Sequence, residues 1–192
     1  MALSDTPKLV ISSLQDVSVL SDFCCGIEEM DDFIHNHLQE SVSNHYCNSY
    51  VVRLEDVVVA MFALNFDSLN FDSDSREEIQ LGVSQNVPSL TADYFETFLM
   101  KHHFPALEIS YFAVVQKYRN QGIGRALIDA IADMAQRQSV AGCMFLTVEA
   151  YIKGGYTAVP FYDKCHFEPC EYRNPNKETL RMFRALYPKS EM

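Results

Sequence analysis

The chain has 192 residues, of which 48% are hydrophobic, 12% aromatic and 21% charged. This composition is too apolar for a disordered protein, and the length predicts a single globular domain over residues 1–192. The 26 acidic and 15 basic residues give a net charge of −11 at pH 7. Because so negative a surface repels phosphate backbones, we do not expect nucleic acid to be a general partner.

No segment is predicted to cross a membrane. The longest apolar run, Val57 to Leu64, has eight residues, far fewer than the ~20 that a membrane-spanning helix needs. The opening segment MALSDTPKLV lacks the charged start and apolar core of a signal peptide, so we expect a cytoplasmic protein with six reduced cysteines. No CxxC pair or zinc-ligand spacing occurs, and no metal is predicted. The adjacent pair Cys24-Cys25 leaves a redox role as an alternative.

The first part of the chain predicts a strand, a helix and a hairpin. LVISSL at residues 9–14 is typical of a strand, and Cys24-Cys25-Gly26 of a turn. A helix is predicted from Ile27 on an apolar set at helical spacing and an acidic set in the first turn, where the helix dipole favours negative charge. The apolar set is Ile27, Met30, Phe33, Ile34 and Leu38, and the acidic set is Glu28, Glu29 and Asp31. The runs SYVVRL and VVVAMFALNF, separated only by Glu55-Asp56, predict a β-hairpin.

Residues 67–104 interrupt this regular pattern. The stretches LNFDSDSREEIQ and SQNVPS are polar and prone to turns, and a short amphipathic helix is predicted between Thr91 and His103. We interpret the segment as an insertion over the core, because long ordered connections of this kind usually carry function.

The second half predicts strands that alternate with helices. A strand at residues 107–115 leads through the turn QKYRNQG into the longest helix, residues 122–138, whose apolar face comprises Leu127, Ile128, Ile131, Met134 and Ala135. A buried strand at CMFLTVEA, a helix over residues 158–165 and two strands, HFEPCEY and TLRMFRALY, follow. This order predicts an α/β (α+β) protein with a mixed central sheet flanked by helices.

The turn before the longest helix is the candidate ligand site. Two glycines allow close approach of the backbone, and the unpaired N–H groups of a first helical turn bind phosphate. Three cations lie there in an otherwise acidic chain: Lys117, Arg119 and Arg125. A P-loop is rejected because Ala126 stands where Ser or Thr is needed, and a dinucleotide fingerprint is weak because Leu127 replaces its third glycine. Two interpretations of the turn remain: a diphosphate site, or a plain glycine turn that opens a core helix.

The segment Arg119-Asn120-Gln121-Gly122-Ile123-Gly124 matches the Arg/Gln-x-x-Gly-x-Gly/Ala signature of the GNAT-type N-acetyltransferases. The hairpin, the signature helix, the following strand and the segment PFYDKCHFE also occur in that family's order. The chain therefore resembles a GNAT protein over most of its length outside the insertion. This resemblance implies a GNAT-like acyl-CoA N-acyltransferase fold and direct acetyl transfer from acetyl-CoA to a primary amine, with no metal.

The resemblance also implies roles for particular residues. The pantetheine arm of acetyl-CoA would pair with the backbone of Phe112, Ala113 and Val114. The diphosphate would lie on the amides of Arg119, Asn120, Gln121, Gly122, Ile123, Gly124 and Arg125. Tyr162 would be the general acid, unless it is an ordinary core tyrosine. Glu108 would be the general base, unless it is a strand-edge carboxylate and water takes the proton.

Two positions depart from the family pattern. Gly155 stands near where an asparagine often hydrogen-bonds the cofactor, which puts one such bond in doubt. His166 replaces a helix-ending glycine, and we expect it to adopt a left-handed cap at some energetic cost.

The acceptor is constrained mainly by charge. Because negative walls attract cations, we expect a small amine, a polyamine or a peptide amine. The opening SDFCCGIEEMDDFIHNHL resembles toxin-type GNATs that acetylate aminoacyl-tRNA, which is one alternative; a non-catalytic acyl-CoA-binding module is another. The acyl-chain preference and the oligomeric state, a homodimer included, are left open.

Overall fold

A computed structural model describes residues 8–70, 96, 100–170 and 178–186. Its strands are β1 (Leu9–Ser13), β2 (Asn48–Leu54), β3 (Val57–Asn70), β4 (His103–Val114), β5 (Phe145–Tyr151), β6 (Glu168–Pro169) and β7 (Thr179–Ala185). Its helices are α1 (Glu28–Asn36), α2 (Leu38–Ser43), α5 (Ile123–Arg137) and α6 (Val159–Lys164), with short 3₁₀ turns at η1 (Val17–Leu20) and η2 (Gln116–Tyr118).

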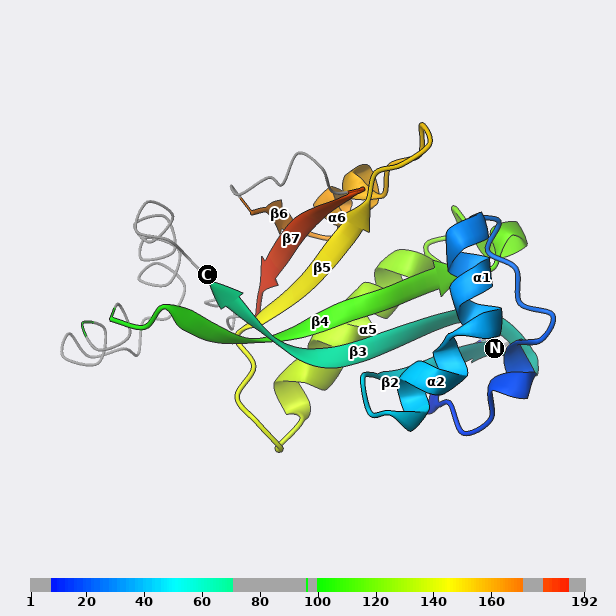
Figure 1. The fold of residues 1–192 in the computed structure, drawn as a ribbon, viewed down its shortest axis with the longest axis horizontal. Helices are drawn as coiled ribbons and strands as arrows, with labels where there is room; N and C mark the ends of the chain where they lie inside the picture. Colours follow the sequence, from blue (N-terminus) through cyan, green and yellow to red (C-terminus); the bar gives the residue numbers. More distant parts are fainter. Residues whose placement is uncertain (1–7, 71–95, 97–99, 171–177, 187–192) are drawn as a thin grey trace, which may run out of the picture. The chain divides into compact units, whose positions relative to one another are not determined.

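The strands are hydrogen-bonded as a seven-stranded sheet in the order β1-β2-β3-β4-β5-β7-β6 (Figure 1). The sheet is mixed, because β4 and β5 run in the same direction whereas β5 and β7 are antiparallel. The predicted fold class is confirmed. The chain divides into two compact units, Met1–Asn65 with Ile109–Leu127 and Phe66–Glu108 with Ile128–Met192.

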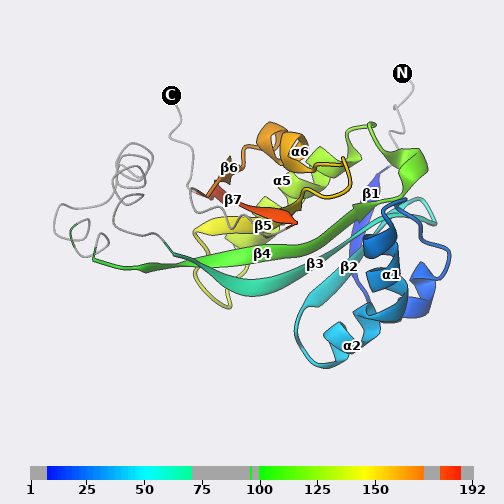
Figure 2. The ribbon, with the colours of Figure 1, turned by 45° about the horizontal axis from the view of Figure 1, so that its top comes forward.

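The first unit contains the predicted hairpin. β1, β2 and the start of β3 pair antiparallel, and the hairpin turns at Glu55, whose φ of 56° is left-handed. The helices α1 and α2 lie on the same side of β2 and β3 (Figure 2). The buried core of this unit consists of Leu14, Leu20, Phe23, Cys25, Ile34, Leu38, Val51, Met61 and Ala113.

The helix predicted from Ile27 through Leu38 is interrupted. His37 leaves helical geometry (φ −125°, ψ −21°), so that α1 ends at Asn36 and Leu38 begins α2. Leu38 is nevertheless fully buried. Because Leu38 is buried as a continuous helix would also require, the apolar spacing alone could not reveal the break at His37.

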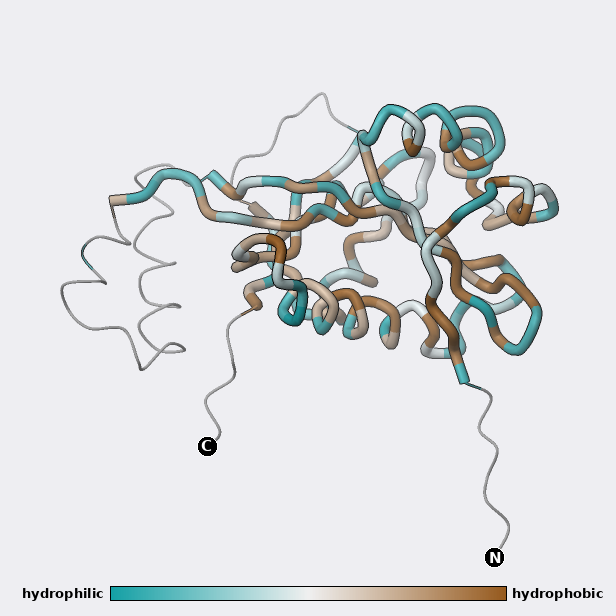
Figure 3. Tube along the Cα trace, turned by 90° about the horizontal axis from the view of Figure 1, so that it is seen from below, coloured by the Kyte–Doolittle hydropathy of each residue, from teal (hydrophilic) through white to brown (hydrophobic). Residues whose placement is uncertain are grey.

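The second unit is built on the antiparallel pair β5 and β7, in which Glu149 lies opposite Arg181. The core of this unit includes Ile128, Ile131, Leu146, Val148 and Met182, each at most 3% exposed. In the trace of Figure 3, hydrophobic and hydrophilic residues alternate along the helical turns, as expected for helices with one buried side. The predicted helix over residues 158–165 is α6, with Pro160 in its first turn.

Both ends of the segment 67–104, which was predicted as an insertion, are parts of strands in the structure. β3 continues to Asn70, and β4 begins at His103, which had been predicted to end a helix. Most of that helix lies outside the described residues, as does the end of the predicted strand HFEPCEY, of which β6 covers Glu168–Pro169. Within the described ranges, no helix is both long and apolar enough to cross a bilayer.

Candidate active site

The turn between β4 and α5, in the first unit, has the geometry of an anion site. The strand passes through η2 into Arg119, whose N–H donates to the carbonyl of Gln116 (3.2 Å). Asn120 (φ 59°) and Gly122 (φ 82°) are both left-handed. A Cβ at Gly122 would meet no atom within 4 Å, so the backbone conformation, and not a lack of space, favours glycine there.

The amides that follow this turn are available as donors. Among the described residues, no acceptor is found for the N–H groups of residues 120–125, and the first to be satisfied is Ala126, which donates to Gly122 (3.1 Å). These groups lie at the start of a 15-residue helix, whose dipole adds positive potential. The arrangement suits an anion with several oxygens, such as a diphosphate.

Cationic side chains surround the same turn. Lys117 and Arg125 are exposed, and Arg119 is half-buried, with its Nε donating to the carbonyl of Val114 (3.4 Å). Within the part of the chain that the structure describes, none of the three is ion-paired with a carboxylate. Their charge is therefore not neutralised by any carboxylate among the described residues.

Asp31 supports this turn from α1, a role that the sequence did not predict. Its carboxylate accepts hydrogen bonds from the amides of Cys25 (2.7 Å) and Gly26 (3.0 Å), and the Cys24 carbonyl accepts one from the Gln116 amide (3.2 Å). Burial opposes ionisation, but the hydrogen bonds from Cys25 and Gly26 outweigh it and lower the pKa of Asp31. Asp31 therefore binds the Cys24–Gly26 loop, which in turn holds the start of η2.

Of the pair Cys24-Cys25, the structure does not favour Cys25 as a redox nucleophile. Cys25 is completely buried, and burial, with the hydrogen bond to Asp31 next, raises the pKa of its thiol to about 12. A thiol with such a pKa stays protonated near neutral pH and is a poor nucleophile.

Tyr162 lies on α6 in the second unit, between two aromatic rings. Its ring packs edge-on against Phe161 (centroids 5.0 Å apart) and Phe167 (5.3 Å). Burial raises the pKa of the phenol, so the hydroxyl keeps its proton at neutral pH. Among the described residues, its hydroxyl has no hydrogen-bond partner. The hydroxyl therefore carries its proton and donates it to no described residue, which is what a proton donor for a bound ligand requires.

His166 ends α6 in the predicted left-handed conformation, with φ of 65°. Its amide donates to the Asp163 carbonyl (3.0 Å), and the Phe167 amide donates to that of Tyr162 (3.0 Å). This pair of bonds is a Schellman cap, which satisfies the last carbonyls of the helix that carries Tyr162.

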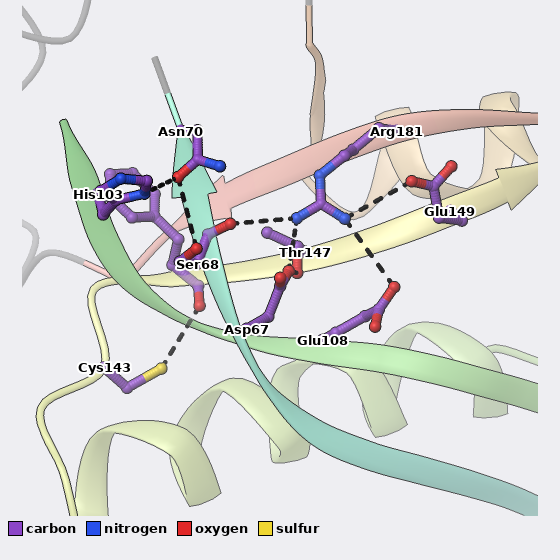
Figure 4. Close-up of polar contacts among 10 residues, drawn as sticks. Asp67, Ser68, Asn70, His103, Glu108, Cys143, Thr147, Glu149 and Arg181 are labelled. Carbon is purple, nitrogen blue, oxygen red and sulfur yellow. Dashed lines mark hydrogen bonds and ion pairs between the residues drawn. The ribbon is translucent and has the colours of Figure 1, made fainter. Parts of the chain in front are cut away.

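Glu108 lies on β4 in the second unit, within a cluster centred on Arg181 (Figure 4). Arg181 on β7 contacts Asp67 (2.5 Å), Glu149 (3.5 Å) and Glu108 (3.9 Å). Burial opposes the charge of Arg181, but the hydrogen bond and charge of Asp67 outweigh it and raise the pKa of the guanidinium. Sequence reasoning missed Arg181, Asp67 and Glu149, because isolated charges on separate strands form no motif.

The chain matches the acetyltransferase (GNAT) family over residues 14–167. It belongs to this family. No curated protein sequence matches it. Among solved structures, the GNAT chain is similar to AtaT complexed with acetyl-methionyl-tRNAfMet (20% identity, 93% of this chain and 95% of that chain covered, TM-score 0.64). It is also similar to AtaTR bound with AcCoA (19%, 93% and 94%, 0.61) and to a mutant of KacT (16%, 93% and 95%, 0.60). At these identities the likeness establishes the fold.

The predicted site residues of this GNAT acetyltransferase are distributed over both units. The predicted catalytic residues Glu108 and Tyr162 lie in the second unit. The predicted cofactor-binding residues, Phe112 to Val114 and Arg119 to Arg125, lie in the first. Phe112, Ala113 and Val114 are the last residues of β4, where Ala113 is buried and its neighbours are half-buried. The amides and cations of the turn, which have no acceptor or carboxylate partner among the described residues, fit a molecule that carries a diphosphate, as acetyl-CoA does.

Proposed function

We propose that this GNAT acetyltransferase moves an acetyl group from acetyl-CoA to a primary amine. The observation that carries the proposal is the row of amides at residues 120–125, which lack acceptors among the described residues and are flanked by unpaired cations. Such a turn binds a diphosphate without a metal. A related fold, that of AtaTR, was solved with AcCoA.

The first unit would bind the cofactor. The amides from Arg119 through Arg125 would hold the diphosphate, and the backbone of Phe112, Ala113 and Val114 would pair with the pantetheine arm. The thioester supplies an acetyl group that a neutral amine can take directly. Lys117 would add attraction for the phosphates from the exposed edge of the turn.

Glu108 would act as general base in this reaction. At neutral pH the acceptor is an ammonium ion, which has no lone pair for attack, so a carboxylate must first remove one proton. The side chain of Glu108 is only 18% exposed, which keeps it in a defined position. The proton that it takes passes to solvent after each turnover.

Tyr162 would act as general acid. Its hydroxyl donates a proton to the sulfur as the carbon–sulfur bond breaks, and the phenol recovers a proton from the newly acylated nitrogen. The raised pKa of Tyr162 keeps that proton in place until negative charge develops on sulfur. The net reaction turns an ammonium and a thioester into an amide, a thiol and one released proton.

We propose that the acceptor is a small cationic amine, a polyamine or a peptide amine. The chain carries a net charge of −11, which attracts cations. Among the ion pairs of the described residues, this cluster has three carboxylates, those of Asp67, Glu108 and Glu149, and one guanidinium. The described surroundings of the proposed base therefore carry more acidic than basic groups. An ammonium group is favoured in such surroundings, and a phosphate backbone is not.

Aminoacyl-tRNA is the second candidate acceptor, because the similar protein AtaT was solved with acetyl-methionyl-tRNAfMet. This finding weighs against the expectation that nucleic acid is not a partner. The free α-amine of an aminoacyl-tRNA would be acetylated by the same acid and base. Its phosphates would need a basic surface, and the cations Lys117, Arg119 and Arg125 lie at the proposed diphosphate site, so the same turn would have to serve the tRNA as well.

A panel of acceptors separates the candidates. Purified protein is given labelled acetyl-CoA with polyamines, peptide amines or charged tRNA, and both acetylated product and released thiol are measured. Transfer to amines supports the main proposal, and transfer to tRNA alone rejects it in favour of the second candidate. Binding of acetyl-CoA without turnover on any acceptor supports a non-catalytic acyl-CoA-binding module. Tyr46→Phe, which removes the hydroxyl of an exposed tyrosine, is the matched control for Tyr162→Phe.

A further inference from the structure

Helix α1 is anchored beside the end of β4 in the first unit. The ring of Phe33 stacks on that of Tyr111, with centroids 3.5 Å apart and planes inclined by 8°. Tyr111 directly precedes the residues proposed to pair with the pantetheine arm, and Figure 1 shows α1 beside this end of β4. Ile34, the next residue of the helix, is only 3% exposed in the core of the same unit. The helix therefore has a defined place relative to the strand.

The same helix binds the loop that precedes it, through Asp31. The carboxylate accepts hydrogen bonds from the amide of Cys25 (2.7 Å), the amide of Gly26 (3.0 Å) and the thiol of Cys24 (3.3 Å). Hydrogen bonds to an ionised acceptor are stronger than those between neutral groups. One side chain of α1 thus holds three consecutive residues of the loop.

The loop is joined in turn to the proposed diphosphate site. The carbonyl of Cys24 accepts a hydrogen bond from the amide of Gln116 (3.2 Å), and the carbonyl of Gln116 accepts one from the amide of Arg119 (3.2 Å). The side chain of Gln116 also lies against Gly26, because a Cβ there would be 3.1 Å from its Cδ and Oε1 atoms. A continuous series of contacts therefore runs from Asp31 to Arg119, where the proposed site begins, and all of it lies within the first unit.

We propose that Asp31 is a positioning residue for the acetyl donor, because it holds the Cys24–Gly26 loop against η2 and thereby keeps the amides of residues 120–125 in the arrangement that binds a diphosphate. This inference rests on the proposed function, since the ligand is the acetyl-CoA assigned to that turn. Asp31 acts through the loop and need not touch the donor. The Cys24-Cys25-Gly26 turn, which the proposed acid and base leave without a role, becomes the connection between α1 and the cofactor site.

The sign of the effect separates positioning from charge. A negative charge near an anion site opposes binding, so a pure charge effect would make Asp31→Asn bind acetyl-CoA more tightly. Loss of positioning has the opposite sign. The amides of Cys25 and Gly26 bind different carboxylate oxygens, and Asn keeps only one acceptor oxygen, so one of the two amides loses its partner. We expect the dissociation constant for acetyl-CoA to rise about tenfold, the effect of one lost hydrogen bond to a charged group.

The test combines titration calorimetry of acetyl-CoA with ¹⁵N NMR of the full chain. In Asp31→Asn, the affinity falls and the amide signals of residues 119–125 move before any ligand is added. Asp32→Asn is the matched control, because it removes the same charge from the next residue of α1, whose carboxylate accepts a hydrogen bond from Asn36 (2.8 Å). This control should neither weaken binding nor move those signals.

Two further measurements probe the same connection. Gly26→Ala disturbs the loop without a change of charge, because φ is 78° and the new Cβ would press on the side chain of Gln116, so it should also weaken acetyl-CoA binding. Coupling between two sites is reciprocal. Acetyl-CoA should therefore slow hydrogen exchange at the amides of Cys25 and Gly26 in the wild type, and do so less in Asp31→Asn.

The inference is overturned if Asp31→Asn binds acetyl-CoA as tightly as Asp32→Asn does, or if its amide signals at residues 119–125 match those of the wild type. If Asp31→Asn does not fold, Gly26→Ala decides, and unchanged affinity in that variant overturns the inference. If the wild type itself does not bind acetyl-CoA, the proposed function fails. The ligand-free signals of residues 119–125 then still decide whether Asp31 positions the turn.

Discussion

Gly122→Ala tests whether the left-handed turn before α5 creates the diphosphate site. Gly122 has φ of 82°, a conformation that costs a residue with a Cβ about 1–2 kcal/mol. Since the added Cβ would meet no atom within 4 Å, the cost is conformational and not a clash. The variant has two ways to accommodate it. It keeps the strained turn and loses stability, or it relaxes the turn and loses the arrangement of amides at residues 120–125.

The loss of folding free energy and the loss of acetyl-CoA binding free energy should add up to the conformational cost of the substitution. If the turn is kept, the free energy of unfolding falls by about 1–2 kcal/mol and acetyl-CoA affinity is unchanged. If the turn relaxes, binding must restore it, and the dissociation constant for acetyl-CoA rises by about 5- to 30-fold, which is the same energy. Denaturant unfolding and titration calorimetry measure the two terms, and we expect their sum to be about 1–2 kcal/mol.

Two other glycines serve as controls. Gly154 has φ of 65° and open space around it, so Gly154→Ala carries the same strain in the second unit and should lose stability while keeping acetyl-CoA affinity. Gly142 has open space and no left-handed φ, so Gly142→Ala should change neither. The reasoning is refuted if Gly122→Ala changes neither quantity, or if Gly154→Ala weakens acetyl-CoA binding as much as Gly122→Ala does.

Three further outcomes are expected. Tyr162→Phe lowers kcat by about 10²–10⁴-fold with no change in acetyl-CoA affinity or loss of stability; normal turnover in this variant would remove Tyr162 from the mechanism. Asp31→Asn lowers the free energy of unfolding by about 1–3 kcal/mol. Because the folded pKa of Asp31 is lowered, its contribution is complete above the ordinary value of 3.8 and is lost as the pH falls below it. The gap between Asp31→Asn and wild type in urea unfolding should therefore be constant from pH 5 to 8 and close only in acid; a gap that varies in the neutral range would contradict this. His166→Gly raises stability by about 1 kcal/mol in thermal unfolding, because glycine adopts the left-handed cap without the cost of a Cβ; a destabilised variant would show that the cap is not strained.

Local sequence patterns predicted most of the fold. The hairpin around Glu55-Asp56, the helix α5 and the left-handed residue His166 all depend on neighbours within a few positions, and the structure has each of them. Apolar periodicity did not predict the break at His37. Leu38 is buried in the structure, as it would also be in one continuous helix, so its apolar character does not distinguish the two. The extension of β3 to Asn70 was missed because Asp67 and Asn70 are atypical of strands.

The candidate site was predictable only where it is contiguous in sequence. The turn from Arg119 to Arg125 is one segment, and its glycines and cations are adjacent in the chain. The cluster around Arg181 joins residues 114 positions apart, Asp67 and Arg181, through strand order alone. Asp31 was assigned to the helix dipole, whereas its carboxylate binds the amides of the preceding loop. Such contacts follow from strand and loop placement, which periodicity does not encode.

The most direct test of the account follows the backbone amides of residues 120–125 by ¹⁵N NMR while acetyl-CoA is added. We expect saturable shifts that are largest at these amides, that CoA reproduces, and that NAD and ATP do not produce at the same concentration. Absence of binding, or shifts confined to other parts of the chain, would contradict the claim that this turn holds the diphosphate of the acetyl donor.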